Sequence, residues 1–125
     1  MNAKQLIKEA LKAQKRAKAQ YSEYPVGAAL LTKNDEIILG CNVESKAYPT
    51  TLCAERVAIF SALAQGYADF KSIAIITLDG ASPCGSCRQI MYEYLNNIPI
   101  YIGNNKNNDF QTYNVNDLLP YPFGK

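Results

Sequence analysis

Three cysteines fall in two short motifs whose spacing favours metal chemistry. The first motif is residues 53–56 (CAER), and the second is residues 83–88 (PCGSCR). Thiolates are strong zinc ligands, and three protein ligands with one open position are typical of a catalytic zinc site. We therefore predict that Cys53, Cys84 and Cys87 bind one Zn²⁺ ion.

Glu55 is the predicted catalytic carboxylate of this site. It lies two residues from Cys53, where it can move the protons of a water activated by the metal. An isolated acid in the first turn of a helix is usually no more than a partner of the helix dipole. Beside a cluster of three cysteines, the catalytic interpretation is the stronger one.

Three thiolates around one Zn²⁺ ion leave a net negative charge, which weakens the metal as a Lewis acid. Two of the chain's arginines, Arg56 and Arg88, lie close to predicted ligands. A guanidinium stays charged at any working pH and can donate two hydrogen bonds at once. We therefore expect Arg56 to donate to the thiolates from outside the ligand set. Arg88 suits either the same task or a surface position early in a helix.

A structural zinc site with four cysteine ligands is the rival interpretation, and Cys41 would supply the fourth. The spacing of Cys84 and Cys87 is common in such sites. However, the gap between Cys41 and Cys53 spans a whole loop and does not resemble a short zinc knuckle. We therefore expect Cys41 to be a small buried residue at the end of a strand.

The composition is that of an ordinary globular protein, with 125 residues, 48% hydrophobic residues and a net charge of +2. This charge is too small to indicate nucleic-acid binding. The absence of histidine excludes Ser-His and Cys-His nucleophilic schemes. No apolar run reaches membrane-spanning length, and residues 1–20 lack the apolar segment of a signal peptide. We therefore expect a cytoplasmic protein whose cysteines serve metal binding or catalysis rather than disulfides.

Hydrophobic periodicity and turn signals predict the elements that position the motifs. In chain order these are helix 4–19, β-hairpin 26–41, helix 53–65, strand 71–78, helix 83–95, strand 98–102, strand 110–115 and a helical turn within 116–120. The short loop before the last strand favours an antiparallel return. The order predicts an α/β fold in which helices cover a mixed five-stranded sheet, in a single domain over residues 1–125.

Both motifs are expected at helix starts. Cys53 would lie in the first turn of one helix, and Thr50 or Thr51 could cap it. In the second motif, Ser82 would be the cap and Pro83 the first helical residue. The positive end of a helix dipole stabilises thiolates.

Two polar residues, Asn42 and Glu44, follow the second strand of the predicted hairpin. They suit either substrate contacts or a plain polar loop, and their spacing does not separate these readings. Earlier in the hairpin, residues 27–29 (GAA) are small enough for another segment to pack closely against the backbone.

Several motifs together resemble those of a known enzyme family. The CAE and PCGSC segments match the three-cysteine form of the zinc-deaminase signature. Residues 21–29 (YSEYPVGAA), 40–44 (GCNVE) and 118–120 (LLP) are similar to further motifs of the small, homotetrameric cytidine deaminases. The resemblance extends from residue 4 to about residue 123.

This resemblance implies a three-layer αβα cytidine-deaminase-like fold and zinc-dependent hydrolysis of cytidine and deoxycytidine. The products would be uridine, deoxyuridine and ammonia, in pyrimidine salvage. Attack would occur at C4 of the ring, with Glu55 carrying a proton to N3 and then to the leaving amine. The backbone amide of Ala54 would bind the ring carbonyl oxygen, and Asn42 and Glu44 would bind the ribose hydroxyl groups.

The resemblance also implies one zinc ion per subunit and a homotetramer whose subunits share their active sites. Tyr48 would lie in the nucleoside loop, and Phe123 would reach the site of a neighbouring subunit. The family commonly has Phe at the position of Tyr24, where the ring packs on the base. Tyr keeps the ring and adds a hydroxyl group.

Two alternatives remain open. The chain could be a zinc deaminase for another aminated heterocycle, such as blasticidin S, or for a base in nucleic acid. A nucleic-acid substrate needs a basic path for its backbone, and Glu44 would repel phosphate, so we expect neither nucleic-acid nor membrane partners. The other class is a zinc-stabilised binding module without activity, for which Glu55 would be dispensable.

Overall fold

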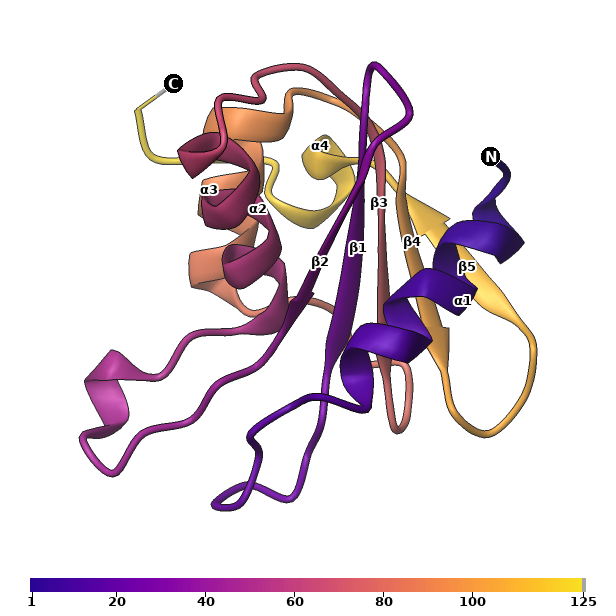
Figure 1. Ribbon diagram of the computed structural model, residues 1–125. Helices are drawn as coiled ribbons and strands as arrows, with labels where there is room; N and C mark the ends of the chain where they lie inside the picture. The colour runs from indigo at the N-terminus through magenta and orange to yellow at the C-terminus, as the bar shows by residue number, and fades with distance from the viewer. Residues whose placement is uncertain (125) are drawn as a thin grey trace.

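The computed structural model describes residues 1–124 and contains one mixed five-stranded sheet (Figure 1). In chain order its elements are α1 (Ala3–Gln14), β1 (Gly27–Thr32), β2 (Ile37–Cys41), the 3₁₀ helix η1 (Tyr48–Thr50), α2 (Ala54–Ala64), β3 (Phe70–Thr77), α3 (Gly85–Leu95), β4 (Ile100–Asn104), β5 (Phe110–Tyr113) and α4 (Val115–Leu118). The strand order is β2-β1-β3-β4-β5, and β3 pairs with β4 in parallel while the other pairs are antiparallel. The predicted mixed sheet is confirmed, as is the antiparallel return of its last strand.

Helices cover both faces of the sheet, which confirms the predicted three-layer arrangement. In Figure 1, α1 lies on one face, and α2 and α3 lie on the other. Residues of β1 alternate between the two sides: Leu30 joins the core beneath α2 and α3, whereas Leu31 joins the core beneath α1. Every residue of β1 is buried, as expected of a central strand with both faces covered.

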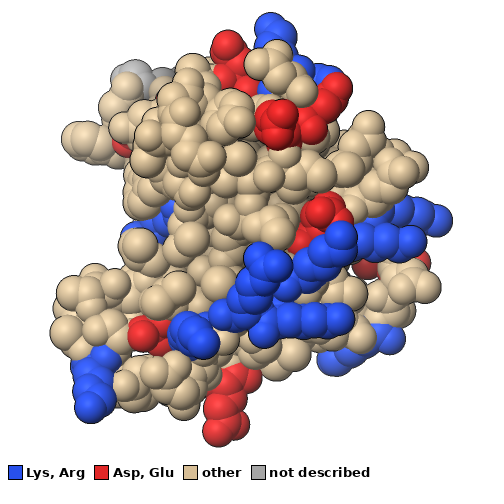
Figure 2. Space-filling model, in the orientation of Figure 1, with Lys and Arg blue, Asp and Glu red and all other residues tan. Residues whose placement is uncertain are grey.

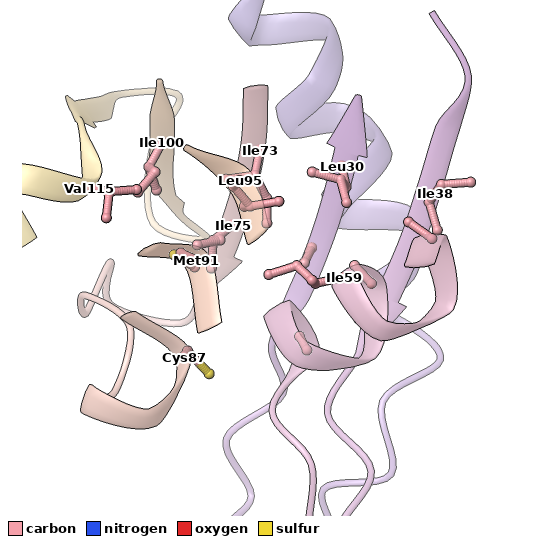
Figure 3. Packing of buried hydrophobic residues seen from close by; sticks show 14 of the residues in the cluster. Leu30, Ile38, Ile59, Ile73, Ile75, Cys87, Met91, Leu95, Ile100 and Val115 are labelled. Atoms are coloured by element: carbon pink, nitrogen blue, oxygen red, sulfur yellow. The ribbon is translucent and has the colours of Figure 1, made fainter. Parts of the chain in front are cut away.

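The larger core extends to the predicted metal site. Ile59 of α2 and Met91 of α3 are fully buried between these helices and the sheet (Figure 3). Cys87 belongs to the same cluster and is itself fully buried. One predicted ligand is therefore fixed by core packing.

Two glycines allow the helices to approach the sheet closely. A Cβ atom on Gly27 would lie 2.0 Å from the carbonyl oxygen of Ala10 in α1. A Cβ atom on Gly40 would lie 2.4 Å from the carbonyl oxygen of Ala54, the first residue of α2. The close approach predicted for residues 27–29 is thus present, and a second one lies beneath the first metal-site motif.

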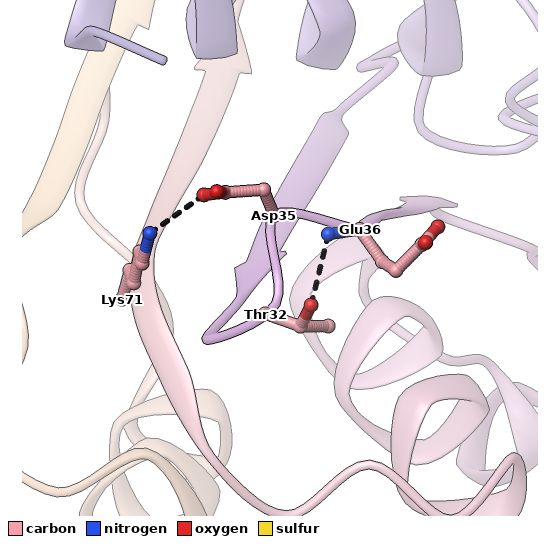
Figure 4. A network of polar contacts seen from close by, with 4 residues as sticks. All are labelled: Thr32, Asp35, Glu36 and Lys71. Atoms are coloured by element: carbon pink, nitrogen blue, oxygen red, sulfur yellow. Dashed lines mark hydrogen bonds and ion pairs between the residues drawn. The ribbon is translucent and has the colours of Figure 1, made fainter.

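The β1–β2 hairpin, predicted at residues 26–41, closes with a turn in which Asp35 has a φ of 66°. The hydroxyl of Thr32 accepts a hydrogen bond from the Glu36 backbone N–H at 2.9 Å. Lys71, at the start of β3, forms an ion pair of 2.6 Å with Asp35 (Figure 4). This exposed end of the hairpin is therefore tied to the neighbouring strand.

The first predicted helix is too long, because α1 ends at Gln14 rather than at residue 19. Beyond this point the backbone pairs with another segment: Lys18 donates to the Asn42 carbonyl at 2.9 Å and accepts from the Glu44 N–H at 2.9 Å. Periodicity alone cannot detect this pairing, since its partner lies in a distant loop.

The predicted helix starts are also corrected. Cys53 and Cys84 are N-cap residues with extended backbone, and the helices begin at Ala54 and Gly85. Thr50 and Thr51 instead belong to η1 and its C-cap. Ser82 and Pro83 lie outside α3, where the side chain of Arg88 binds both of them.

Strand ends near the C-terminus shift by a few residues. The fourth strand starts at Ile100 rather than at residue 98, and β5 ends at Tyr113. Asn114 then caps α4 through a reciprocal pair of hydrogen bonds with Asp117, which ends the strand two residues earlier than predicted. The predicted helical turn is present at Val115–Leu118.

Basic side chains gather over α1 on the face shown in Figure 2. The lysines of this helix are Lys4, Lys8 and Lys12.

Within residues 1–124, no helix is long and apolar enough to cross a membrane.

Candidate active site

The three predicted zinc ligands form one cluster. Cys53 Sγ lies 3.7 Å from Cys84 Sγ, and Cys84 Sγ lies 3.5 Å from Cys87 Sγ. All three sulfur atoms lie within 4.8 Å of one another. Two sulfurs bound to one tetrahedral zinc ion, with Zn–S bonds of about 2.3 Å, are separated by about 3.8 Å. The cluster therefore fits one zinc ion, which confirms the predicted cofactor.

Two helix N-termini bring the sulfurs together. Cys53 is the N-cap of α2, Cys84 is the N-cap of α3, and Cys87 lies in the first turn of α3. Neither N-cap side chain makes a capping hydrogen bond, so both sulfurs are available to a metal. The unpaired N–H groups of a helix start and its positive dipole end favour negative charge.

Hydrogen bonding within the cluster favours a thiolate at Cys53. The Cys87 thiol, followed by the Arg56 guanidinium and Cys84, lowers the pKa of Cys53 to about 5. The same contact with Cys53, together with burial, raises the pKa of Cys87. One sulfur is thus already suited to bind a cation at neutral pH.

Arg56 lies beside this thiolate, as the sequence predicted. Its Nη2 donates to Cys53 Sγ at 3.5 Å, and this contact raises the pKa of the guanidinium. Its Nε is buried and is the one buried side-chain nitrogen or oxygen in residues 1–124 that lacks a hydrogen-bond partner. The guanidinium therefore remains charged against the sulfur cluster and can offset part of its negative charge.

Glu55 points inward rather than to solvent. Its side chain is buried and lines the same cavity as Cys53 and Cys84. Burial raises the pKa of Glu55 to about 7. A carboxyl group with this pKa can both accept and release a proton near neutral pH.

The cavity beside the cluster has a volume of about 270 Å³. It lies between the loop before β1, the loop that leads from β2 into α2 and the loop that leads from β3 into α3. Its lining comprises Ser22, Tyr24, Val26, Asn42, Glu44, Thr51, Leu52, Cys53, Glu55, Ile75, Thr77, Ala81, Ser82, Pro83 and Cys84. Two larger cavities, at the C-terminal end of α3 and beside α1, do not touch the sulfur cluster. A third, of about 350 Å³, adjoins this cavity and shares Ser22, Glu44 and Thr51 with it.

Asn42 lines this cavity but also supports its wall. Its side-chain oxygen accepts from the Val26 N–H at 2.9 Å, and its side-chain nitrogen donates to the Tyr24 carbonyl at 3.0 Å. One N–H and one lone pair of the amide remain for a ligand. Asn42 therefore fixes the segment before β1 at the end of β2.

Glu44 holds the neighbouring loop. One carboxylate oxygen accepts from the backbone N–H groups of Tyr21 at 2.9 Å and Ser22 at 3.0 Å, and the other accepts from the Ser22 hydroxyl. These hydrogen bonds, with Ser22 as the main donor, lower the pKa of Glu44. The carboxylate that lines the cavity is consequently charged at neutral pH.

Tyr24 reaches across the cavity to the far loop. Its hydroxyl donates to Asp79, which follows β3. Sequence patterns do not reveal this contact, because 55 positions separate the two residues.

Two predicted substrate-binding residues, Tyr48 and Phe123, are not part of the lining of this cavity. Tyr48 is 72% exposed and packs edge-on against Tyr21, at a ring-centroid distance of 6.2 Å. Phe123 is 85% exposed, and its backbone binds the side chain of Gln89. Neither ring therefore lines the site cavity in this chain, although Tyr48 lines the adjoining cavity.

Arg88 and Cys41 do not join the sulfur cluster. Arg88 donates 2.7 Å hydrogen bonds to the Pro83 carbonyl, the Leu118 carbonyl and the Ser82 hydroxyl. The metal-binding group found among residues 1–124 comprises three cysteines and does not include Cys41. Cys41 is half-buried at the end of β2, so the four-cysteine interpretation is not supported.

Comparisons with protein-family models, curated proteins and solved structures each identify relatives of this chain. The family model described as "Cytidine and deoxycytidylate deaminase zinc-binding region" matches residues 1–102. A cytidine deaminase of Sporosarcina psychrophila is 44% identical over 128 residues, covering 100% of this chain and 93% of the relative. Another, from Halalkalibacterium halodurans, is 42% identical, covering 98% of this chain and 95% of the relative. The crystal structure of cytidine deaminase from Burkholderia pseudomallei superposes with a TM-score of 0.93 at 40% identity, covering 98% of this chain and 100% of that chain.

Proposed function

This chain belongs to the cytidine deaminase family, and we propose that its three-cysteine site hydrolyses cytidine and deoxycytidine to uridine and deoxyuridine. The observation that carries this function is the buried carboxyl of Glu55, which lines the same cavity as Cys53 and Cys84, two members of the three-sulfur cluster. Cys53, Cys84 and Cys87 would hold the Zn²⁺ ion, which would supply a Lewis acid able to activate a water for attack on the base.

Glu55 carries the protons of the reaction. It takes one proton from the attacking water and passes it to N3 of the ring. It then takes the second proton from the new hydroxyl group on C4 and gives it to the amine, which leaves as ammonia when the C4–N bond breaks. Its pKa of about 7 suits both directions of transfer. Arg56 offsets the charge of the thiolates, which keeps the site electrophilic.

Other residues orient the nucleoside. The Ala54 N–H, the first of α2, donates to the ring carbonyl oxygen, since a helix start leaves such groups free. The free lone pair of Asn42 and the carboxylate of Glu44 accept hydrogen bonds from ribose hydroxyls. The ring of Tyr24 packs against the base. The charge on Glu44 disfavours a phosphate nearby, which supports a nucleoside rather than a nucleotide as substrate.

We further infer that the functional unit is a homotetramer of single-domain subunits with shared sites. Large apolar side chains remain exposed on one subunit, including Tyr48 at 72%, Tyr121 at 91% and Phe123 at 85%. Aromatic residues are enriched at interfaces between subunits. Four free thiols suit a reducing compartment, so we retain the cytoplasm as the proposed location.

Absorbance of cytidine in the ultraviolet tests the proposed reaction directly. Purified protein should convert cytidine to uridine, and a zinc chelator should abolish this conversion. Glu55→Gln should reduce kcat by about 10³-fold or more, because the proton carrier is lost, while zinc content and thermal stability are retained.

Three other results would contradict this proposal. Full activity of the zinc-free protein would remove the metal from the reaction. Conversion of blasticidin S or of cytosine in single-stranded DNA, without conversion of cytidine, would identify one of the alternative deaminases. No turnover of any of these compounds would favour the binding module.

A further inference from the structure

The hydroxyl of Tyr24 makes a hydrogen bond at the cavity wall to Asp79, a residue 55 positions away in the sequence. The backbone of Tyr24 is fixed on one side, since its carbonyl accepts from Asn42 at 3.0 Å and its N–H donates to the Ser22 hydroxyl at 3.1 Å. The side chain extends to the other side of the cavity and donates to Asp79 Oδ1. The residue thus connects the loop before β1 with the loop after β3.

Asp79 is itself held in a compact turn. Its Oδ1 also accepts from the Ala81 N–H at 3.2 Å, and the Thr77 hydroxyl accepts from the Gly80 and Ala81 N–H groups at 2.8 and 3.1 Å. Gly80 has a φ of +79°, a conformation that side chains other than glycine rarely adopt. The acceptor for Tyr24 is therefore fixed in place before any substrate binds.

The charges match the direction of this hydrogen bond. Burial and the neighbouring carboxylate raise the pKa of Tyr24, so its hydroxyl keeps the proton that it donates. The hydrogen bond from Tyr24 lowers the pKa of Asp79, so the acceptor stays charged. Hydrogen bonds to a charged partner are stronger than neutral ones.

We propose that Asp79 is a positioning residue that fixes the ring of Tyr24 as one wall of the substrate cavity. This inference rests on the proposed function, because the ring is taken to pack against the base. Tyr24, Thr77 and Ala81 all line the cavity, whereas Asp79 is exposed and is not part of that lining. Holding the ring before binding removes the entropic cost of ordering it with each substrate molecule.

Steady-state kinetics of Tyr24→Phe test the proposal, since this change removes the hydroxyl and keeps the ring. We expect KM for cytidine to rise about fivefold, the size expected for loss of one charged hydrogen bond at a partly exposed site. Neither kcat, zinc content nor Tm should change appreciably. Asp79→Ala should raise KM by a similar factor. Asp79→Asn should keep KM close to the parental value, because the amide oxygen still accepts the hydrogen bond. The double variant Tyr24→Phe/Asp79→Ala should have a KM no higher than that of Tyr24→Phe.

Two matched controls lie away from the site. Tyr101→Phe removes a hydroxyl on the α1 side of the sheet, and Asp69→Ala removes an exposed acid before the opposite end of β3. Both should leave KM unchanged. An unchanged KM in Tyr24→Phe would overturn the proposal. So would a fall in zinc content or kcat at constant KM, because that would place the effect at the metal.

Hydrogen exchange separates this proposal from the proposed reaction. Without substrate, the amides of residues 79–82 should exchange faster in Tyr24→Phe than in the parent chain, whereas amides of β4 should not. Equal exchange would overturn the positioning role even if cytidine were turned over normally. Failure of the parent chain to deaminate cytidine would instead reject the proposed function.

Discussion

Arg88 holds the metal-binding loop through oxygen atoms rather than through sulfur. Its Nε and Nη2 bind the Pro83 carbonyl and the Ser82 hydroxyl, both at 2.7 Å, directly before the ligand Cys84. Its Nη1 binds the Leu118 carbonyl at the end of α4. The sequence left two roles open for Arg88. It does not donate to the thiolates, and it is not an unpaired surface arginine, because its guanidinium binds three oxygen atoms.

Arg88→Gln should therefore hold the zinc ligand Cys84 less rigidly, because Ser82 and Pro83 directly precede it. A glutamine cannot reach all three acceptors, so we expect zinc to leave about tenfold faster, within the range typical of groups that orient metal ligands. Release can be followed with a chromogenic chelator. The unfolding free energy should also fall by about 1–3 kcal/mol, because three hydrogen bonds, two of them partly buried, are weakened or lost.

Two variants separate the loop from general stability. Arg16→Gln changes an exposed arginine after α1 and should leave zinc release unchanged. Ser82→Ala removes one loop contact and leaves the contact with α4, so zinc release should accelerate by a smaller factor. If Arg88→Gln lowers Tm but releases zinc at the parental rate, Arg88 stabilises the packing of α4 and does not position the zinc ligand.

The packing of α2 on β2 controls the position of the catalytic segment. Gly40 has no space for a side chain, since a Cβ atom would lie 2.4 Å from the Ala54 carbonyl oxygen and 2.5 Å from the Ala58 backbone nitrogen. Both contacts are backbone atoms, which cannot rotate away. Any larger residue must therefore displace the start of α2, which carries Cys53 and Glu55.

Gly40→Ala should impair both stability and catalysis. Overpacking of this kind typically costs about 1–3 kcal/mol, which thermal unfolding would detect, and kcat should fall because Glu55 moves relative to the sulfurs. Gly85→Ala is the matched control for stability, since no atom outside its own helical turn and chain neighbours lies within 4 Å of the added Cβ. Equal Tm values for the two variants would show that α2 adjusts without strain.

Elements with a strong local pattern could be predicted from the sequence, whereas contacts between distant segments could not. Two strand-like runs separated by a polar turn within residues 26–41 predicted the hairpin, and the cysteine spacing predicted a cluster that the fold does assemble. The helix start at Ser82 was wrong because Arg88 binds that residue. The contact of Tyr24 with Asp79 depends on tertiary structure and leaves no periodic signal.

At the scale of the whole molecule, α3 connects the metal site to the C-terminal segment. Gln89 follows the ligand Cys87 by two residues, and its amide pairs with both backbone groups of Phe123, at 3.0 and 3.1 Å. The Phe123 ring is nevertheless 85% exposed. A fixed backbone with an exposed aromatic ring suits a residue presented to another subunit.

Phe123→Ala should raise KM for cytidine about tenfold if this ring completes the site of a neighbour, as expected for an aromatic anchor at an interface. Gln89→Ala should have a similar but smaller effect, because the ring remains but its backbone is released. Gln65→Ala removes an exposed amide at the end of α2 and should be neutral. Gel filtration should show the same oligomer for all three variants.

Mixing two defective chains tests whether the sites are shared. In a shared-site oligomer, a Glu55→Gln subunit can lend its intact Phe123 to a Phe123→Ala subunit, which retains Glu55. Co-expression of the two variants should therefore produce sites with a nearly parental KM. If each subunit instead works alone, the mixture will show only the KM of Phe123→Ala, at half its specific activity, and the shared tetramer must be abandoned.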